Sequence, residues 1–280
     1  MTRLSPLSLH VGDISLALTC DNEPLSALLG ARYQAWQRDA PGACTVAVQV
    51  GDRPAPPQRR TPEISFTPEG RCRVTAPGYV GELAPNGAHA QLTIDYPDVA
   101  GVDYFLRVAL ALLAYEAGGL LLHAAGLRRG SATFLFSGPS GIGKSTAARV
   151  SASLPEMAVL GDDLILLLPQ RGGWRAYGTP FWNPETPVRL RRAQTESGLL
   201  RAHFRLAQDP QVYVRPLSRA QAVAGLLADL PIVTLDARRL PTLLGRIGQL
   251  AATTPIGELH LRPDPGFWSA LDAFLETPPA

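Results

Sequence analysis

Hydrophobic and polar residues follow two different patterns along this chain, and the change comes near residue 100. Before it, short apolar runs separated by turn residues predict strands at residues 14–19, 44–50, 64–66, 73–75 and 90–94. A helix is predicted at residues 24–37, and the proline-rich stretch 51–62 predicts a loop. We therefore expect residues 1–100 to form a small, mostly antiparallel α+β module. It carries no chemical motif, so its expected role is packing or scaffolding, with recognition of a substrate leader or a partner as the alternative.

The rest of the chain alternates longer helical patterns with apolar strands. The predicted helices are residues 103–117, 146–154, 220–229 and 265–275, and the predicted strands are residues 120–127, 132–137, 157–160, 164–168, 174–177, 231–235 and 256–261. A hairpin turn at residues 128–130 joins the first two of these strands. The pattern predicts an α/β domain with a mixed sheet over residues 101–280.

Composition narrows the class of protein only slightly. The chain has 280 residues, 46% hydrophobic and 18% charged, which is enough for a sizeable core and argues against disorder. A net charge of +2 gives no indication of binding to nucleic acid or membrane. The three cysteines, Cys20, Cys44 and Cys72, form no C-x-x-C pair, so neither a zinc site nor a disulfide framework is indicated. With no signal peptide expected, reduced thiols in a cytoplasmic protein are the simplest interpretation.

The strongest chemical signal is the sequence G-P-S-G-I-G-K-S at residues 138–145. It fits the phosphate-binding pattern G-x-x-x-x-G-K-[ST], and it lies between a predicted strand and a predicted helix. The glycines allow successive N–H groups to face one anion, and the helix N-terminus adds a favourable dipole. Lys144 supplies a charge for the outer phosphates, and Ser145 offers a hydroxyl to Mg²⁺.

Two adjacent carboxylates, Asp162 and Asp163, follow the next predicted strand. Between Lys144 and this pair there is room for only one short helix and one strand, which is a compact spacing for a nucleotide-hydrolysing fold. At a strand tip, one carboxylate can approach Mg²⁺ while the other takes a proton from an attacking hydroxyl. His123 lies one hairpin before the glycine-rich loop, so it can reach the phosphates or an aspartate, although an isolated His on an apolar strand is often only a core residue.

These residues resemble a known family. The runs L-L-H-A-A-G-L (residues 121–127), F-S-G-P-S-G-I-G-K-S-T (136–146) and L-G-D-D (160–163) are similar to the catalytic domain of bacterial HPr kinase/phosphorylase. They resemble still more the HPr-kinase-related proteins that accompany ribosomally made peptides, including lasso-peptide kinases, and the fold kinship extends to phosphoenolpyruvate carboxykinase. The resemblance is sharp over residues 120–168, diffuse to residue 261, and does not cover residues 1–100.

The resemblance implies a role for each matching position. The nucleotide phosphates would be held by Gly138, Pro139, Ser140, Gly141, Ile142, Gly143, Lys144, Ser145 and Thr146. The catalytic residues would be Asp162 as the base, His123 beside it or beside the phosphates, and Lys144. Mg²⁺ would be held by Ser145, by Asp163 and by Glu185, which is the nearest candidate for the family's downstream glutamate.

Two departures from the family pattern limit what can be carried over. Ser145 is followed by Thr146 where the HPr enzyme has Ser then Glu, and the downstream glycine-rich signature has no clear counterpart. HPr itself and the reverse phosphorolysis are therefore not expected. The nearby arginines Arg189, Arg191 and Arg192 fit a phosphate- or acceptor-binding edge and a solvated basic strand equally well.

The sequence thus predicts an ATP- and Mg²⁺-dependent kinase that phosphorylates a serine hydroxyl of a small protein or peptide, such as the precursor of a peptide natural product. A nucleotide-dependent binding module and a small-molecule kinase or carboxykinase-like enzyme are the alternatives. The identity of the acceptor, the preferred nucleotide and assembly into a homo-oligomer stay open at this stage.

Overall fold

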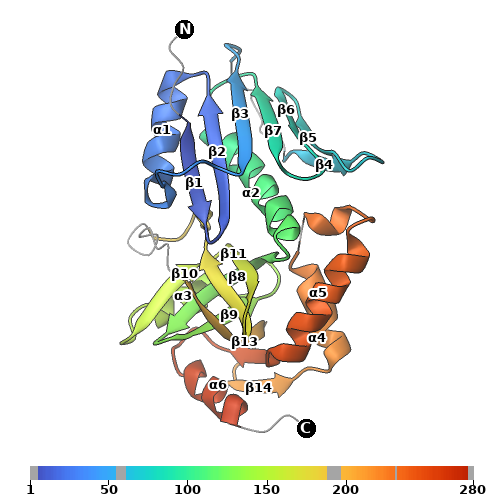
Figure 1. Cartoon of the computed structure of the whole chain (residues 1–280). Coiled ribbons are helices and arrows are strands. Elements are labelled where there is room, and N and C mark those ends of the chain that lie inside the picture. The colour runs from blue at the N-terminus through green and yellow to red at the C-terminus, as the bar shows by residue number, and fades with distance from the viewer. Residues whose placement is uncertain (1–5, 55–60, 188–196, 231, 277–280) are drawn as a thin grey trace. The chain divides into compact units, whose positions relative to one another are not determined.

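The computed structural model of this chain describes residues 6–54, 61–187, 197–230 and 232–276 (Figure 1). In these residues it is a mixed α/β structure with two mixed sheets and six α-helices. The chain divides into two compact units, one made of Met1–Ala117 and Ile232–Arg239, the other of Gly118–Pro231 and Leu240–Ala280. The predicted boundary after residue 100 falls within the first unit, because the helix that follows it packs on the first sheet.

The sheet of the first unit has seven strands in the order β1-β2-β3-β7-β6-β5-β4. Their bounds are β1 Leu7–Val11, β2 Ile14–Cys20, β3 Cys44–Val50, β4 Glu63–Phe66, β5 Cys72–Ala76, β6 Tyr79–Leu83 and β7 His89–Ile94. Pairing is antiparallel except where β3 lies parallel to both β2 and β7. Buried and exposed residues alternate along the central strands, so one face of the sheet builds the core. Three buried free thiols, those of Cys20, Cys44 and Cys72, lie in this core.

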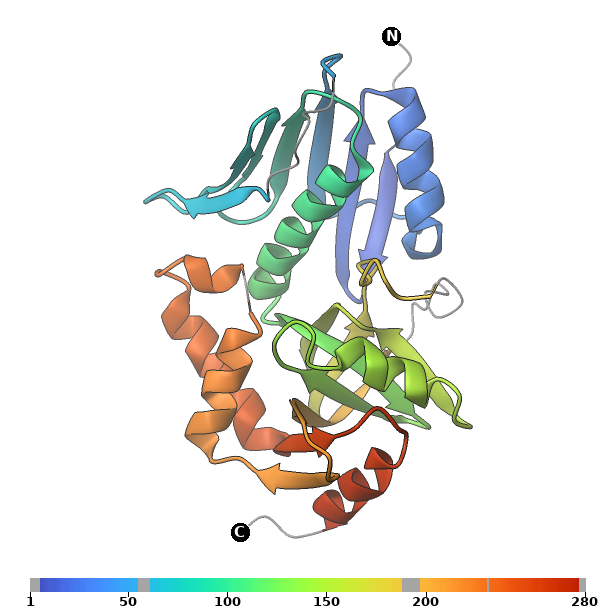
Figure 2. The same cartoon turned by 180° about the vertical axis from the view of Figure 1, so that it is seen from behind.

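Two helices cover the buried face of this sheet (Figure 2): α1, Glu23–Tyr33, followed by the 3₁₀ turn Gln34–Trp36, and α2, Val99–Glu116. The side chains of Asn22 and Asp98 cap their N-termini. Arg32 of α1 donates to Asp103 of α2, with Nε to Oδ1 at 2.8 Å. Gly81 of β6 leaves room for the ring of Phe105, since a Cβ there would lie 2.3 Å from it.

The segment Ile232–Arg239 returns to the first unit. Residues 231–235 were expected to form a strand, but Val233–Leu235 is a 3₁₀ turn and residue 231 lies outside the described residues. Arg239 anchors the segment: it pairs with the buried Asp236, donates to the carbonyl of Pro85 at 2.7 Å, and lies over the ring of Tyr115. Such side-chain anchoring fixes a connection that has no sheet partner.

The second unit contains the larger sheet. Its strands are β8 Leu120–Arg129, β9 Ala132–Ser137, β10 Met157–Gly161, β11 Leu164–Gln170, β12 Gly173–Gly178, β13 Ser197–Gln208, β14 Tyr213–Pro216 and β15 Ile256–Leu261. The pairs β8–β11, β11–β12, β12–β13, β13–β9 and β9–β8 close the sheet into a ring. Strand β10 extends the sheet beside β8, and β15 with β14 extends it beside β13. The predicted hairpin between β8 and β9 is confirmed.

Four helices pack on this sheet: α3 Lys144–Ser151, α4 Arg219–Ala228, α5 Leu240–Thr253 and α6 Phe267–Glu276. Helices α4 and α5 lie against each other, while α3 contacts β8, β9 and β10. The last helix is anchored by Trp268, which packs edge-on against Phe134 and Phe136 and whose Nε1 donates to Ser151 Oγ at 3.0 Å. This aromatic cluster fixes β9 and α3, the two elements that flank the glycine-rich loop. Within the described residues no helix has the length and apolar character needed to cross a bilayer.

Candidate functional site

The glycine loop, residues 138–143, joins the end of β9 directly to the start of α3. The φ angles of Gly138, Gly141 and Gly143 are +135°, +79° and +120°, values that residues other than glycine rarely adopt. A Cβ on Gly141 or Gly143 would meet no atom within 4 Å. Gly141 and Gly143 are therefore required by the backbone angles and not by crowding, and this part of the loop borders open space.

Lys144 is the first residue of α3 and is buried, with 7% of its surface exposed. Its Nζ donates to the carbonyls of Gly138 and Pro139, at 2.8 and 3.1 Å. Burial lowers the pKa of this ammonium, and the charges of Asp229, Asp163 and Asp162 oppose the shift. The lysine thus lies beside the loop among three carboxylates.

Asp162 is almost completely buried, and both of its carboxylate oxygens accept hydrogen bonds. Oδ1 accepts from the main-chain N–H of Asn183 at 3.2 Å, and Oδ2 accepts from the hydroxyl of Thr186. The side-chain amide of Asn183 in turn donates to Ser145 Oγ at 3.3 Å. Asn183, in the loop after β12, therefore links Asp162 to the first turn of α3.

Asp163 and His123 form a second, more accessible group. His123 Nε2 lies 3.5 Å from Asp163 Oδ1, and the side chains are 37% and 18% exposed. The pairing register explains the contact: Leu164 of β11 lies opposite His123 of β8, and Ala124 N–H donates to the carbonyl of Asp163 at 3.1 Å. This carboxylate can be reached from solvent, whereas that of Asp162 cannot.

Other predicted site residues are not brought into this group. Glu185 is exposed, and its main-chain N–H donates to Asn183 Oδ1 at 3.0 Å. No described contact joins its carboxylate to Ser145 or Asp163. Among the described residues no set of three or more His, Cys, Asp or Glu side chains could hold a metal ion. The arginine cluster of Arg189, Arg191 and Arg192 lies outside the described residues.

Sequence analysis missed several polar residues that surround the loop. Asn183 and Thr186 lie in the segment F-W-N-P-E-T (residues 181–186), in which only Glu185 was predicted to be a site residue. Ser137, the last residue of β9, is fully buried, and its hydroxyl lies 2.7 Å from His203 Nε2. Burial together with Arg205 lowers the pKa of His203 to about 3. Asp229, which follows α4, is the fifth such residue.

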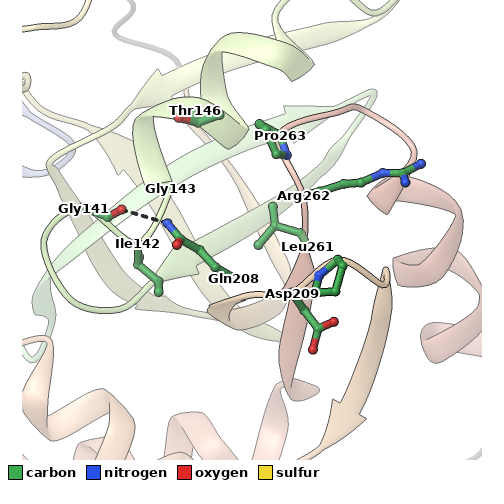
Figure 3. A pocket seen from close by; sticks show the side chains of 10 residues that line it. Gly141, Ile142, Gly143, Thr146, Gln208, Asp209, Leu261, Arg262 and Pro263 are labelled. Carbon is green, nitrogen blue, oxygen red and sulfur yellow. Dashed lines mark hydrogen bonds between the residues drawn. The ribbon is translucent and has the colours of Figure 1, made fainter.

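A pocket of about 510 Å³ opens beside the glycine loop (Figure 3). Its lining comes from the loop and α3, from the end of β13 and from the end of β15: Gly141, Ile142, Gly143, Thr146, Gln208, Asp209, Pro210, Leu261, Arg262 and Pro263. Gln208 Nε2 donates to the carbonyl of Gly141 at 3.2 Å and holds the loop against β13. The carboxylate of Asp209 accepts from the N–H of Gln211 at 2.9 Å and from His260 Nδ1 at 3.1 Å. The pocket therefore has a fixed, mixed polar and apolar wall.

These features define a mixed α/β protein with a glycine-rich strand–loop–helix site flanked by carboxylates. Residues 105–275, more than half of the chain, match the family described as SynChlorMet cassette protein ScmC, and the chain belongs to that family.

Comparison with solved structures finds the Hpr(Ser) kinase/phosphatase from Coxiella burnetii, at 14% identity, covering 55% of this chain and 86% of that one. The TM-score of this match is 0.31. Among curated proteins there is no match.

Proposed function

We propose that this protein is a kinase that uses ATP and Mg²⁺ to phosphorylate a serine hydroxyl of a peptide or small protein. One observation carries the proposal. Ser137, the residue before the glycine loop and its lysine, lies opposite Ala124, which follows His123 of the accessible carboxylate–histidine pair. A nucleotide-binding module without transfer has no use for an exposed carboxylate at this point.

The residues around the loop fit a nucleotide. Three glycines with positive φ allow the loop N–H groups to face one anion, and the N-terminus of α3 adds its dipole. Thr146 and the loop itself form one wall of the neighbouring pocket, whose volume of about 510 Å³ suits a base and a sugar. Phosphates in the loop would leave the nucleoside within reach of that pocket.

The same residues fit a magnesium ion that retains waters and phosphate oxygens, since such a site needs only one or two protein ligands. The hydroxyl of Ser145 and the carboxylate of Asp162 both hydrogen-bond to Asn183 and would supply these ligands. The ion would neutralise charge on the phosphates. In this arrangement Asp162 takes the metal side and Asp163 the base, which exchanges the roles that the family resemblance implies.

The transfer step then follows from the accessible pair. Asp163 accepts the proton of the serine hydroxyl while the serine oxygen forms a new bond to the terminal phosphorus. The bond from that phosphorus to the bridging oxygen breaks, and the nucleoside diphosphate leaves with the electron pair. His123 holds the orientation of Asp163, and Lys144 stabilises charge on the phosphate oxygens.

The experiment is incubation of the purified protein with ATP, Mg²⁺ and serine-containing peptides, followed by mass spectrometry. The family description names a cassette, so peptides encoded in the same cassette are the first acceptors to test. We expect a gain of one phosphate on a peptide serine. Asp163→Asn should reduce the transfer rate by about 10² to 10⁴ while ATP still binds, and Asp162→Asn should weaken Mg²⁺-dependent ATP binding.

Three results would contradict this proposal. Wild-type transfer rates in Asp163→Asn would exclude it as the base. ATP binding without transfer to any peptide would favour the binding module, and transfer to free serine alone would favour a small-molecule kinase.

A further inference from the structure

Asp229 is a buried carboxylate in the second unit that the mechanism above does not use. It follows the last residue of α4 and is 5% exposed. A negative charge at the C-terminus of a helix is opposed by the helix dipole, and burial adds a desolvation cost. Both effects disfavour a carboxylate at this position, so compensating interactions are expected around it.

Asp229 is tied to both strands that carry the site. Its main-chain carbonyl accepts the N–H of His123 in β8 at 2.8 Å. Its carboxylate accepts a hydrogen bond from the hydroxyl of Ser137, the residue before Gly138. Because Ser137 has only one proton to donate, His203 Nε2 must carry the hydrogen in its own 2.7 Å contact with Ser137. This chain of hydrogen bonds fixes one side of the carboxylate.

The other oxygen, Oδ2, is buried and has no hydrogen-bond partner in the part of the chain that the structure describes. Three basic side chains act on this carboxylate through their charges, those of Arg205, His123 and Lys144. Among the charges that act on Lys144, Asp229 has the largest effect, ahead of Asp163 and Asp162. Ser137 is followed by Gly138, whose carbonyl accepts from Lys144 Nζ at 2.8 Å, so the anchored carboxylate with one unpaired oxygen lies near the part of the loop that the lysine contacts.

We propose that Asp229 is a built-in counterion of Lys144, which competes with the outer phosphates of the nucleotide and limits how tightly they bind. This inference rests on the proposed nucleotide site. A buried carboxylate offers the lysine the same kind of partner as a phosphate oxygen, so the ammonium retains a counter-charge when product leaves. Asp229 therefore tunes affinity and release, in contrast to Asp163, which acts on the acceptor hydroxyl.

The proposal predicts a sign that loss of structure cannot produce. Asp229→Asn keeps the size of the side chain and an oxygen for Ser137 but removes the charge. Binding of ATP should tighten by at least about fivefold, because one buried negative charge near the phosphates is lost. The gain should shrink from ATP to ADP to AMP, since fewer phosphates reach the lysine. Isothermal titration or a fluorescent nucleotide measures all three affinities, and release of ADP should slow in stopped-flow.

Asp272→Asn is the matched control. This variant removes one negative charge from the surface ion pair between Asp272 of α6 and Arg129 of β8, and it should leave the three affinities unchanged. If Asp229→Asn does not fold, Ser137→Ala tests the same idea from the other side. It frees the carboxylate to turn towards Lys144, and so should weaken ATP binding about two- to threefold at an unchanged net charge.

Weaker or unchanged ATP binding in a folded Asp229→Asn protein would overturn the counterion proposal, as would an equal gain for AMP and ATP. These outcomes are separate from the proposed kinase activity, because they concern binding alone. If Asp229→Asn binds ATP more tightly than the wild type, but the wild type phosphorylates no acceptor, the counterion proposal stands and the kinase proposal fails.

Discussion

Replacing Thr186 by valine tests how the carboxylate of Asp162 is held. Valine has nearly the shape of threonine but no hydroxyl, so Asp162 Oδ2 loses the hydrogen bond that it accepts. Thr186 is 5% exposed and Asp162 only 2%, so water cannot easily replace the lost donor. The hydrogen bond that Oδ1 of Asp162 accepts from the N–H of Asn183 is unaffected.

The expected cost follows from the burial of that oxygen. A hydrogen bond to a charged group contributes about 1.5 to 3 kcal/mol, and a buried acceptor left unpaired loses most of it. Taking about 2 kcal/mol, and about 2 to 4 °C per kcal/mol for a unit of this size, the melting temperature of the second unit should fall by about 4 to 8 °C. This expectation holds whatever reaction the site performs.

Scanning calorimetry of three proteins measures the effect: the wild type, Thr186→Val and Thr186→Ser. Serine keeps the hydroxyl and loses only a methyl group, which costs about 1 kcal/mol, so it should melt above the valine variant. If serine is as destabilising as valine, packing of the methyl group dominates and the hydrogen-bond argument fails. An unchanged melting temperature for valine would show that the carboxylate finds another donor.

Two further predictions concern buried charged or ionisable groups. His203 has a folded-state pKa of about 3, against about 6.5 in the unfolded chain. Between these pH values only the unfolded chain binds a proton at His203. The contribution of neutral, buried His203 to the free energy of unfolding should therefore be fully present above pH 6.5 and be lost as the pH falls towards 3. Denaturant titrations from pH 7 to pH 4 measure this slope, which should flatten in His203→Gln, and an identical slope in that variant would contradict the assignment. Arg239→Leu leaves the buried Asp236 with Arg238 as its remaining partner, and should destabilise the first unit by about 3 to 5 kcal/mol. Chemical denaturation followed by fluorescence checks this value, and an unshifted midpoint would show that Arg238 suffices.

Much of the site's frame could be predicted from local sequence. The strand, glycine loop and helix at residues 132–151 appear where the pattern places them, because a buried strand, glycine angles and a helix start are each encoded within a few residues. The hairpin of β8 and β9 is encoded in the same way. The contact of His123 with Asp163 needed only one more step, the pairing of β8 with β11.

Elements that depend on distant partners could not be predicted. Strand β13 pairs with the preceding strand β12 and with β9 and β15, which are distant in sequence, and its arginines and His203 hide the apolar pattern. Helix α5 was not among the predicted helices, and it contains Pro241 and two glycines, residues of low helix propensity. It still buries Leu243, Ile247 and Leu250, spaced as one helical face requires, so a weak signal was present.

The three carboxylates near Lys144 show why residue type alone cannot assign roles. Asp162 has both oxygens engaged by protein groups, which suits a fixed ligand and not a proton acceptor. Asp163 is partly exposed beside a histidine, so an acceptor hydroxyl can approach it. Asp229 follows helix α4, much later in the chain. One of its carboxylate oxygens accepts a hydrogen bond from Ser137, and the other has no partner among the described residues. Their sequence signals predict one acidic pair, whereas the different burial and hydrogen bonding of each group argue for three separate tasks around one lysine.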